Sequence, residues 1–221
     1  MNGIYKTSIL CVFILFICCN MMAQDVSIGG KIAYSMPTNI GRSSDELGFN
    51  DVAKGGVHFA FVGKWFYNER LTLGYDFGYQ FQKGDEGFWD VDNRGDVSAS
   101  YQTVRLLIDG CYYFSHDEVR PYVGLAFGAY YLNNNMDFTA NSITNTSVAY
   151  RAKEWKPGIA PQFGVLFELS KKTMLDCKLQ MDLIAHLEPT VSHDPNYGMV
   201  TQNPHGNQNQ FNLSVALLFE L

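Results

Sequence analysis

The stretch that decides the fold is LTLGYDFGYQF, which runs from Leu71 to Phe81. Every second residue in it is Leu, Tyr or Phe, and the residues between them are Thr, Gly, Asp and Gln. Successive side chains of a β-strand point to opposite faces, whereas a helix would spread this alternation around its circumference. The stretch therefore predicts a strand with one large apolar face and one small or polar face.

The same alternation recurs seven more times, beginning with a strand over about Asp25 to Met36. In chain order, the apolar faces are Val26, Ile28, Ile32, Tyr34, Met36; Val57, Phe59, Phe61, Trp65; Val104, Leu106, Ile108, Tyr112, Phe114; Val123, Leu125, Phe127, Ala129, Tyr131; Ile159, Phe163, Val165, Phe167, Leu169; Leu175, Cys177, Leu179, Met181, Leu183; and Phe211, Leu213, Val215, Leu217, Phe219, Leu221. The total of eight strands is an even number, and each strand is long enough to cross a bilayer at a tilt.

Short and long connections alternate between these strands. The short turns are 67–69, 115–118 and 170–173, and the long polar segments are 37–53, 83–99, 133–153 and 189–207. All short turns then fall at one end of the sheet and all long loops at the other, as in bacterial outer-membrane barrels. We predict an all-β fold: an eight-stranded antiparallel up-and-down transmembrane β-barrel.

The beginning of the chain has the features of a secretory signal. Lys6 precedes an unbroken apolar run from Ile9 to Cys19, and Ala23 stands as a small residue before Gln24. This run is shorter than the roughly 20 apolar residues of a membrane-spanning helix. We therefore expect a cleaved signal peptide at 1–23 and one barrel domain at 24–221, with lipoprotein processing at Cys18 or Cys19 as the weaker alternative.

Charge and cysteine content exclude some classes of function. The formal net charge is −6, and removal of residues 1–23 takes away only the positive charge of Lys6, so a nucleic-acid partner is not expected. Cys111 and Cys177 then remain, on opposite faces of strands that are not neighbours. We expect two free thiols without a redox or metal role.

The polar face indicates which way the barrel wall is turned. A soluble, lipocalin-like barrel would cover its water face with long charged side chains, but this face consists largely of Gly, Ala, Ser, Thr and Gln. Such residues suit the crowded lumen of an eight-stranded barrel. Its charged members carry both signs: Lys31, Lys64, Arg105, Lys178, Asp76, Asp109, Glu168, Asp176, Asp182 and Glu220. We expect them to form a compensated network that plugs the lumen, in preference to a proton or ion path.

Aromatic residues gather toward the two ends of the strands, which predicts two interfacial girdles. The group at the short turns is Trp65, Phe66, Tyr67, Tyr112, Tyr113, Phe114 and Phe219, and the group at the long loops is Tyr34, Tyr79, Phe81, Tyr101, Tyr131 and Trp155.

The hairpin from Thr103 to Tyr131 resembles the central hairpin of small outer-membrane barrels of the OmpA/OmpX-like kind, including those of Bacteroidetes-type bacteria. The chain departs from their usual terminal Phe or Trp by ending at Leu221. The resemblance implies an outer-membrane location in a Gram-negative bacterium. It also implies lipopolysaccharide and phospholipid around the wall, and contact with the barrel-insertion machinery. Such barrels serve as anchors, adhesins, envelope-stability proteins and some lipid-modifying enzymes, so no single activity follows.

Two groups of residues suggest catalysis. Ser115-His116-Asp117 contains the residue types of a triad, but neighbours in a tight turn point apart. His186 and Glu188 share a face where a lipid-modifying enzyme could hold a catalytic pair, yet no serine is identifiable as their partner. We therefore predict a non-enzymatic barrel with no catalytic site, whose long loops contact an extracellular partner.

Two further groups suggest metal binding. The segment Asp90–Asp96 alternates oxygen-bearing residues before Gly95, but Arg94 and Tyr101 stand where a calcium loop needs oxygen ligands. His193 and His205 are isolated in a polar loop. We predict no metal or cofactor site and leave cation binding at Asp90–Asp96 open.

Overall fold

The structure is a computed structural model and describes residues 26–40, 48–85, 87, 95–140, 147–185, 191–194, 198–201 and 207–221. The predicted signal peptide lies outside these residues. The elements are β1 (Val26–Pro37), α2 (Phe49–Val52), β2 (Gly56–Phe66), β3 (Leu71–Lys83), β4 (Gly95–Tyr113), β5 (Val119–Ala140), β6 (Ser147–Ser170), β7 (Thr173–Ile184), β8 (Val191–Asp194), β9 (Gly198–Thr201) and β10 (Gln210–Glu220).

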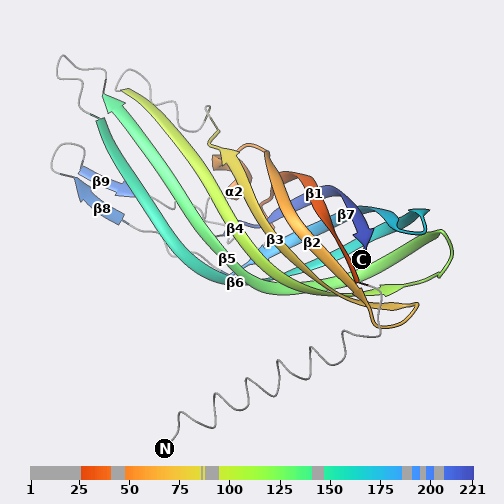
Figure 1. The fold of residues 1–221 in the computed structure, drawn as a ribbon. Coiled ribbons are helices and arrows are strands. Elements are labelled where there is room, and N and C mark those ends of the chain that lie inside the picture. Colours follow the sequence, from red (N-terminus) through yellow and green to blue (C-terminus); the bar gives the residue numbers. More distant parts are fainter. Residues whose placement is uncertain are drawn as a thin grey trace, which may run out of the picture.

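Eight strands close into a barrel in the order β1-β10-β7-β6-β5-β4-β3-β2, and every neighbouring pair is antiparallel (Figure 1). Closure runs through β1 and β10, where Ile32 pairs with Val215. The last strand is therefore part of the wall, and no edge is left open at this seam. The predicted eight-stranded up-and-down topology is confirmed.

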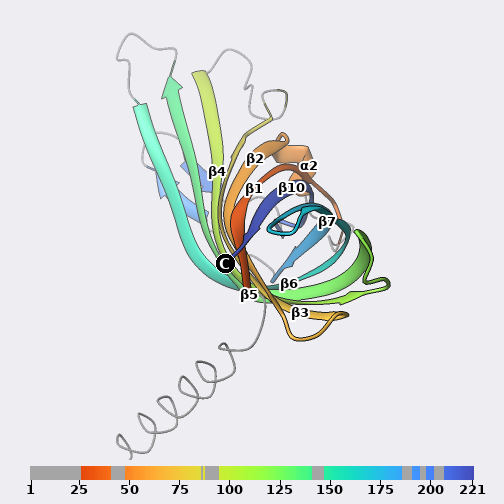
Figure 2. The same cartoon turned by 45° about the vertical axis from the view of Figure 1, so that its right-hand side comes forward.

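All four predicted long loops contain regular structure. β4, β5 and β6 continue into the segments predicted as loops 83–99 and 133–153, and together they project beyond the rest of the barrel (Figure 2). The fourth predicted loop contains the separate hairpin β8-β9. The assignment of these segments to loops was wrong because apolar alternation identifies only strands that have an apolar face. Backbone hydrogen bonding between strands continues where both faces are polar. The first predicted loop contains the short helix α2, and no described helix is long and apolar enough to span a membrane.

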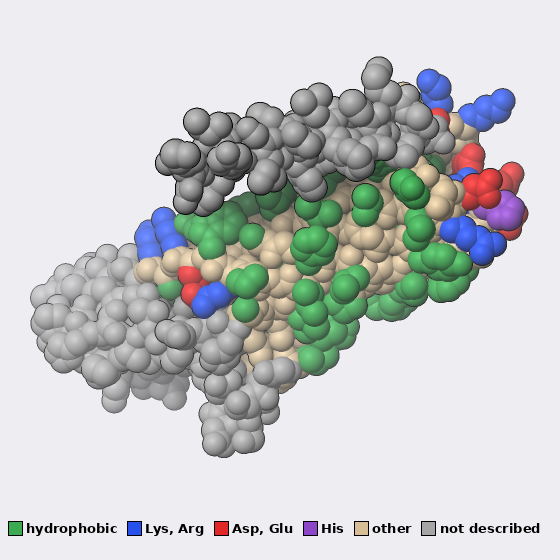
Figure 3. All heavy atoms as spheres, turned by 90° about the horizontal axis from the view of Figure 1, so that it is seen from below, with side chains coloured by type: hydrophobic (Ala, Val, Ile, Leu, Met, Phe, Trp, Pro, Cys, Tyr) green, Lys and Arg blue, Asp and Glu red, His purple; other side chains and the backbone are tan. Residues whose placement is uncertain are grey.

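The apolar face of every barrel strand points outward. Phe77 and Leu106 are 55% and 54% exposed, whereas their chain neighbours Asp76 and Arg105 are 5% and 1% exposed. Hydrophobic side chains line the outer wall, and charged side chains gather toward its ends (Figure 3). This sidedness agrees with the prediction and is opposite to that of a soluble barrel with an apolar lumen.

Glycine makes the narrow barrel possible at particular points of its wall. A Cβ atom on Gly29 would overlap the backbone carbonyl of Leu217, and one on Gly128 would overlap that of Leu106. In contrast, Gly30 faces outward, and a Cβ there would meet nothing within 4 Å.

The two predicted girdles are confirmed only in part. Tyr67, Tyr112 and Phe114 are exposed at the short-turn end, and Tyr34, Tyr79 and Trp155 at the long-loop end. Tyr113 and Tyr101, however, are buried, and Phe66 packs against the buried cluster that contains Tyr113. These three lie on the inward face of their strands, so their assignment to the girdles was wrong. The reason is the alternation of side chains along a strand: Tyr113 follows Tyr112 by one residue and therefore points to the opposite face.

Candidate functional site: the lumen and its two mouths

The lumen holds balanced charge. Among the described residues, the buried charged side chains are Lys31, Lys64, Arg105 and Lys178 and the carboxylates Asp76, Asp109, Asp176 and Asp182. All eight were assigned to the lumen from the sequence. Glu168 and Glu220, assigned with them, are partly exposed at the short-turn end. Because a buried charge without a partner is costly, the equal numbers of the two signs lower the cost of burying these side chains.

Arg105 is the centre of one network. Its Nη1 donates to Asp182 on β7 at 2.9 Å, and its Nη2 donates to Asp76 on β3 at 3.1 Å. Lys31 binds the same Asp76 carboxylate. The other acceptor sites of Asp182 are filled by amides, with Asn212 donating at 2.9 Å and Gln180 at 2.6 Å. One guanidinium thus links β4 to a strand on the far side of the barrel.

A second network lies nearer the short turns. Lys64 on β2 pairs with Asp176 on β7 at 2.9 Å, and it also donates to the Tyr113 hydroxyl at 2.9 Å. Tyr122 donates to Asp176 at 2.7 Å, and its ring lies under the Lys64 ammonium at 4.4 Å. The rings of Tyr113 and Tyr122 have centroids 5.1 Å apart. Apolar side chains complete this layer, among them Val62, Leu166, Met174 and Leu218.

Cys111 belongs to a polar group between these two networks. The Gln162 amide donates to Asp109 at 2.6 Å and lies 3.3 Å from the Cys111 sulfur. Cys177 is half-buried on the other face of the wall. Both thiols are free and lie on opposite faces, as predicted.

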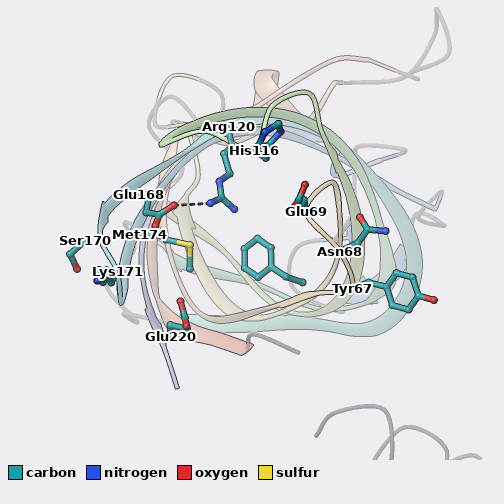
Figure 4. A pocket seen from close by; sticks show the side chains of 11 residues that line it. Tyr67, Asn68, Glu69, His116, Arg120, Glu168, Ser170, Lys171, Met174 and Glu220 are labelled. Carbon is teal, nitrogen blue, oxygen red and sulfur yellow. Dashed lines mark hydrogen bonds and ion pairs between the residues drawn. The ribbon is translucent and has the colours of Figure 1, made fainter. Parts of the chain in front are cut away.

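The short-turn mouth forms a vestibule of about 500 Å³, with Phe66 and Met174 among its lining residues (Figure 4). At one side of this mouth, Arg120 on β5 binds Glu168 on the neighbouring strand β6 at 2.7 Å, and it also donates to the Asp117 carbonyl at 2.9 Å. The Ser115 hydroxyl donates to the Val119 carbonyl. Ser115-His116-Asp117 therefore forms the predicted turn, in which Ser115 and Asp117 bind backbone or Arg120 rather than His116.

The long-loop mouth is covered from one side by α2. Phe49 and Val52 are buried there, and the Phe49 ring meets the Tyr101 ring edge-on at 5.2 Å. Amide side chains fill the adjoining space, since Gln208 donates to Asn134 at 3.2 Å and Asn209 donates to the Ile40 carbonyl at 2.7 Å.

Sequence reasoning missed His58. It lies on the inward face of β2, is fully buried, and neither of its ring nitrogens has a hydrogen-bond partner among the described residues. His58 lies an even number of residues from the inward residues Ala60, Val62 and Lys64. Alternation along the strand was therefore sufficient to predict that His58 points inward.

Most other candidates lie outside the described residues. These are His186, Glu188, His205 and the segment 90–94; for His193, in β8, only the backbone is described. Gly95 and Asp96 belong to β4, so the candidate cation segment ends in a strand. Within the described part of the chain, no three His, Cys, Asp or Glu residues are placed to hold a metal ion.

No protein-family model and no curated protein sequence matches the chain. Several solved structures do match the chain. A major outer membrane protein from Thermus thermophilus is 14% identical, with a TM-score of 0.51 over 88% of this chain and 99% of that one. Neisserial surface protein A is 12% identical, with a TM-score of 0.49 over 89% and 97% of the two chains. The outer membrane protease OmpT from Escherichia coli is 10% identical, with a TM-score of 0.48 over 90% and 96%. The Thermus likeness shows that the two chains share a fold.

Proposed function

We propose that this chain is an exported, non-enzymatic integral protein of a Gram-negative outer membrane. One observation carries the proposal: the outer wall exposes large apolar side chains, such as Phe59, Phe77 and Phe127, each more than half exposed at 56%, 55% and 57%. In water, so large an apolar surface would drive association, whereas lipid tails cover it without loss. The described strands satisfy their backbone groups within a closed sheet, as a membrane-spanning wall must.

The lumen in this proposal is a structural plug. Support comes from the position of its ion pairs, since Arg105–Asp182 and Lys64–Asp176 both join strands that are not neighbours. Ion pairs that cross a narrow barrel fill the space an open channel would need. The tyrosine and aliphatic layer around Tyr113 and Tyr122 adds a second barrier near the short turns.

The proposed role is therefore contact or envelope stability rather than chemistry. The β4–β6 projection and the long loops would meet an extracellular partner, and the wall would meet lipopolysaccharide, phospholipid and, during biogenesis, the barrel-insertion machinery. No nucleic-acid partner is proposed. Among the described residues, many polar side chains of the lumen, such as Arg105, Tyr122 and Gln162, are bound to one another in networks. The Cys111 thiol donates to the Asp109 carboxylate at 3.5 Å, but it is buried among these side chains, away from any substrate in the membrane or in water.

The test uses spin labels on the folded mature chain in phosphatidylcholine vesicles. Labels at Phe77 and Leu106 should be accessible to oxygen, which concentrates in lipid, and protected from a water-soluble nickel chelate. A label at Lys171 in a short turn should show the reverse. A mature chain that stays monomeric in buffer without detergent, or labels at residues 77 and 106 that meet the nickel chelate, would overturn the proposal.

A further inference from the structure

The outer wall changes character over three successive rows of residues across β3, β4, β5 and β6. From the barrel toward the loops, these rows are Tyr79, Val104, Tyr131 and Trp155; then Phe81, Gln102, Asn133 and Lys153; then Lys83, Ser100, Asn135 and Arg151. The register pairs each residue directly with the next one in its row. Within two rows, aromatic and apolar side chains therefore give way to amides, a hydroxyl and three cations.

These three cations, Lys83, Lys153 and Arg151, form what we call the basic rim. All three are exposed. Among the described residues, no carboxylate lies within 4.0 Å of any of them. Asp85 and Asp137 follow the rim on the loop side without pairing with it. The amides between the cations bind one another or the rim, since Asn133 donates to Gln102 at 2.9 Å and Arg151 donates to Asn135 at 3.3 Å.

The opposite end of the barrel shows that this charge pattern is specific to one side. There, the basic residues Arg70, Arg120, Lys171 and Lys172 alternate with the acidic residues Glu69, Asp117, Glu118, Glu168 and Glu220. One of these cations, Arg120, is already bound to Glu168. The five acidic residues at the short-turn end therefore outnumber its four basic residues, whereas the three cations of the rim lie together in two adjacent rows of the wall.

Directly below the rim lies an aromatic pair. Trp155 is 63% exposed, and its ring centroid is 5.1 Å from that of Tyr131. Below the pair on the same two strands, Ile159 and Phe127 are exposed and paired in register. Along this face, the cations come first, then the aromatic pair, then the apolar side chains. A membrane lipid has its parts in the matching order: the phosphate group, the interfacial region and the acyl chains.

We propose that the basic rim binds the phosphate group of anionic lipid in the membrane leaflet on the long-loop side. This rests on the proposed function, because only a barrel in a bilayer presents its wall to lipid. Arg151 offers the planar, forked donor set that suits phosphate oxygens, and Lys83 and Lys153 add point charges. Trp155 and Tyr131 pack at the interface, and the acyl chains lie on Ile159 and Phe127.

The test uses Trp155 as a local probe. Replacement of the other two tryptophans, by Trp65→Phe and Trp89→Phe, leaves it as the sole tryptophan of the mature chain. This protein is folded into phosphatidylcholine vesicles that contain, at equal mole fraction, either brominated phosphatidic acid or brominated phosphatidylcholine. The ratio of the two quenching efficiencies reports whether anionic lipid is enriched at the rim.

We expect phosphatidic acid to quench more strongly, with about a five-fold enrichment for each positive charge at low salt. The double substitution R151Q/K153Q removes two of the three charges and should lower the ratio about 25-fold, and K83Q should lower it about five-fold. The matched control R70Q/K172Q also removes two charges, at the other end, and should leave the ratio unchanged. Heat-modifiable gel migration confirms that each variant is folded.

The remaining outcomes separate the two proposals. Equal quenching by both lipids, or enrichment that R151Q/K153Q leaves undiminished, overturns lipid binding by the rim and leaves the membrane barrel intact. Enrichment lost equally in R70Q/K172Q also overturns it, because the effect then follows net charge alone. Quenching by neither lipid overturns the membrane barrel itself.

Discussion

Arg105 on β4 and Asp182 on β7 meet across the lumen with a nitrogen–oxygen distance of 2.9 Å, although 77 residues separate them in the chain. Neither strand is a neighbour of the other in the sheet. This ion pair therefore connects two non-neighbouring strands through the lumen, and each partner is almost fully buried.

Removal of the guanidinium should destabilise the barrel strongly. Arg105→Gln leaves Asp182 without its cation and Asp76 with Lys31 alone, a change that costs about 3–5 kcal/mol for a buried ion pair. The free energy of unfolding, from urea titration in vesicles or detergent, measures the loss. Addition of Asp182→Asn should restore part of it, and the exposed Arg70→Gln serves as the control. An unchanged unfolding curve for Arg105→Gln would contradict the network.

The two adjacent glycines of β1 should respond oppositely to the same substitution. Gly29→Ala forces a methyl group against the backbone of β10 at the barrel seam, which should cost about 1–3 kcal/mol. Gly30→Ala places that methyl group in the open space outside the wall, so stability should be unchanged or slightly raised. The fraction of heat-modifiable folded protein and urea unfolding measure both variants. Equal effects would mean that the sidedness of β1 is wrong.

The lumen should pass little steady current in planar bilayers. Replacement of both Tyr113 and Tyr122 by Ala removes the ring layer around Lys64 and should raise single-channel conductance measurably. Tyr112→Ala, one residue away on the outer face, should not. A large open conductance in the unaltered protein would refute the plug.

The two cysteines offer a chemical test of the two faces. In the folded protein in vesicles, Cys111 should resist both a charged and an uncharged maleimide, because it is buried among lumen side chains. Cys177 should react slowly, and with the uncharged reagent only, because that reagent alone enters the lipid phase and few thiols ionise to the reactive thiolate there. Both should react in urea. Labelling of Cys111 by the charged reagent in the folded state would indicate a water-filled lumen.

Much of this architecture was predictable because the alternation of apolar and polar residues along a β-strand identifies its two faces. Leu71 to Phe81 was recognisable as a wall strand, and the same alternation placed Asp76, Arg105 and Asp182 in the lumen. Prediction failed where alternation is absent or misleading. The polar extensions of β4, β5 and β6 carry no apolar face, and Tyr113 was grouped with Tyr112 by residue type although its position turns it inward.

The sequence alone thus determined the number of strands, their faces and the end at which the turns are short, because each of these depends on neighbours within one strand or one turn. Which charges pair across the lumen, and which cations gather beside Trp155, depends on the stagger between strands. Stagger is set by closure of the whole sheet, when β10 meets β1. Only the tertiary structure could therefore decide that Arg105 reaches Asp182 and that Lys83 lies in one row with Arg151.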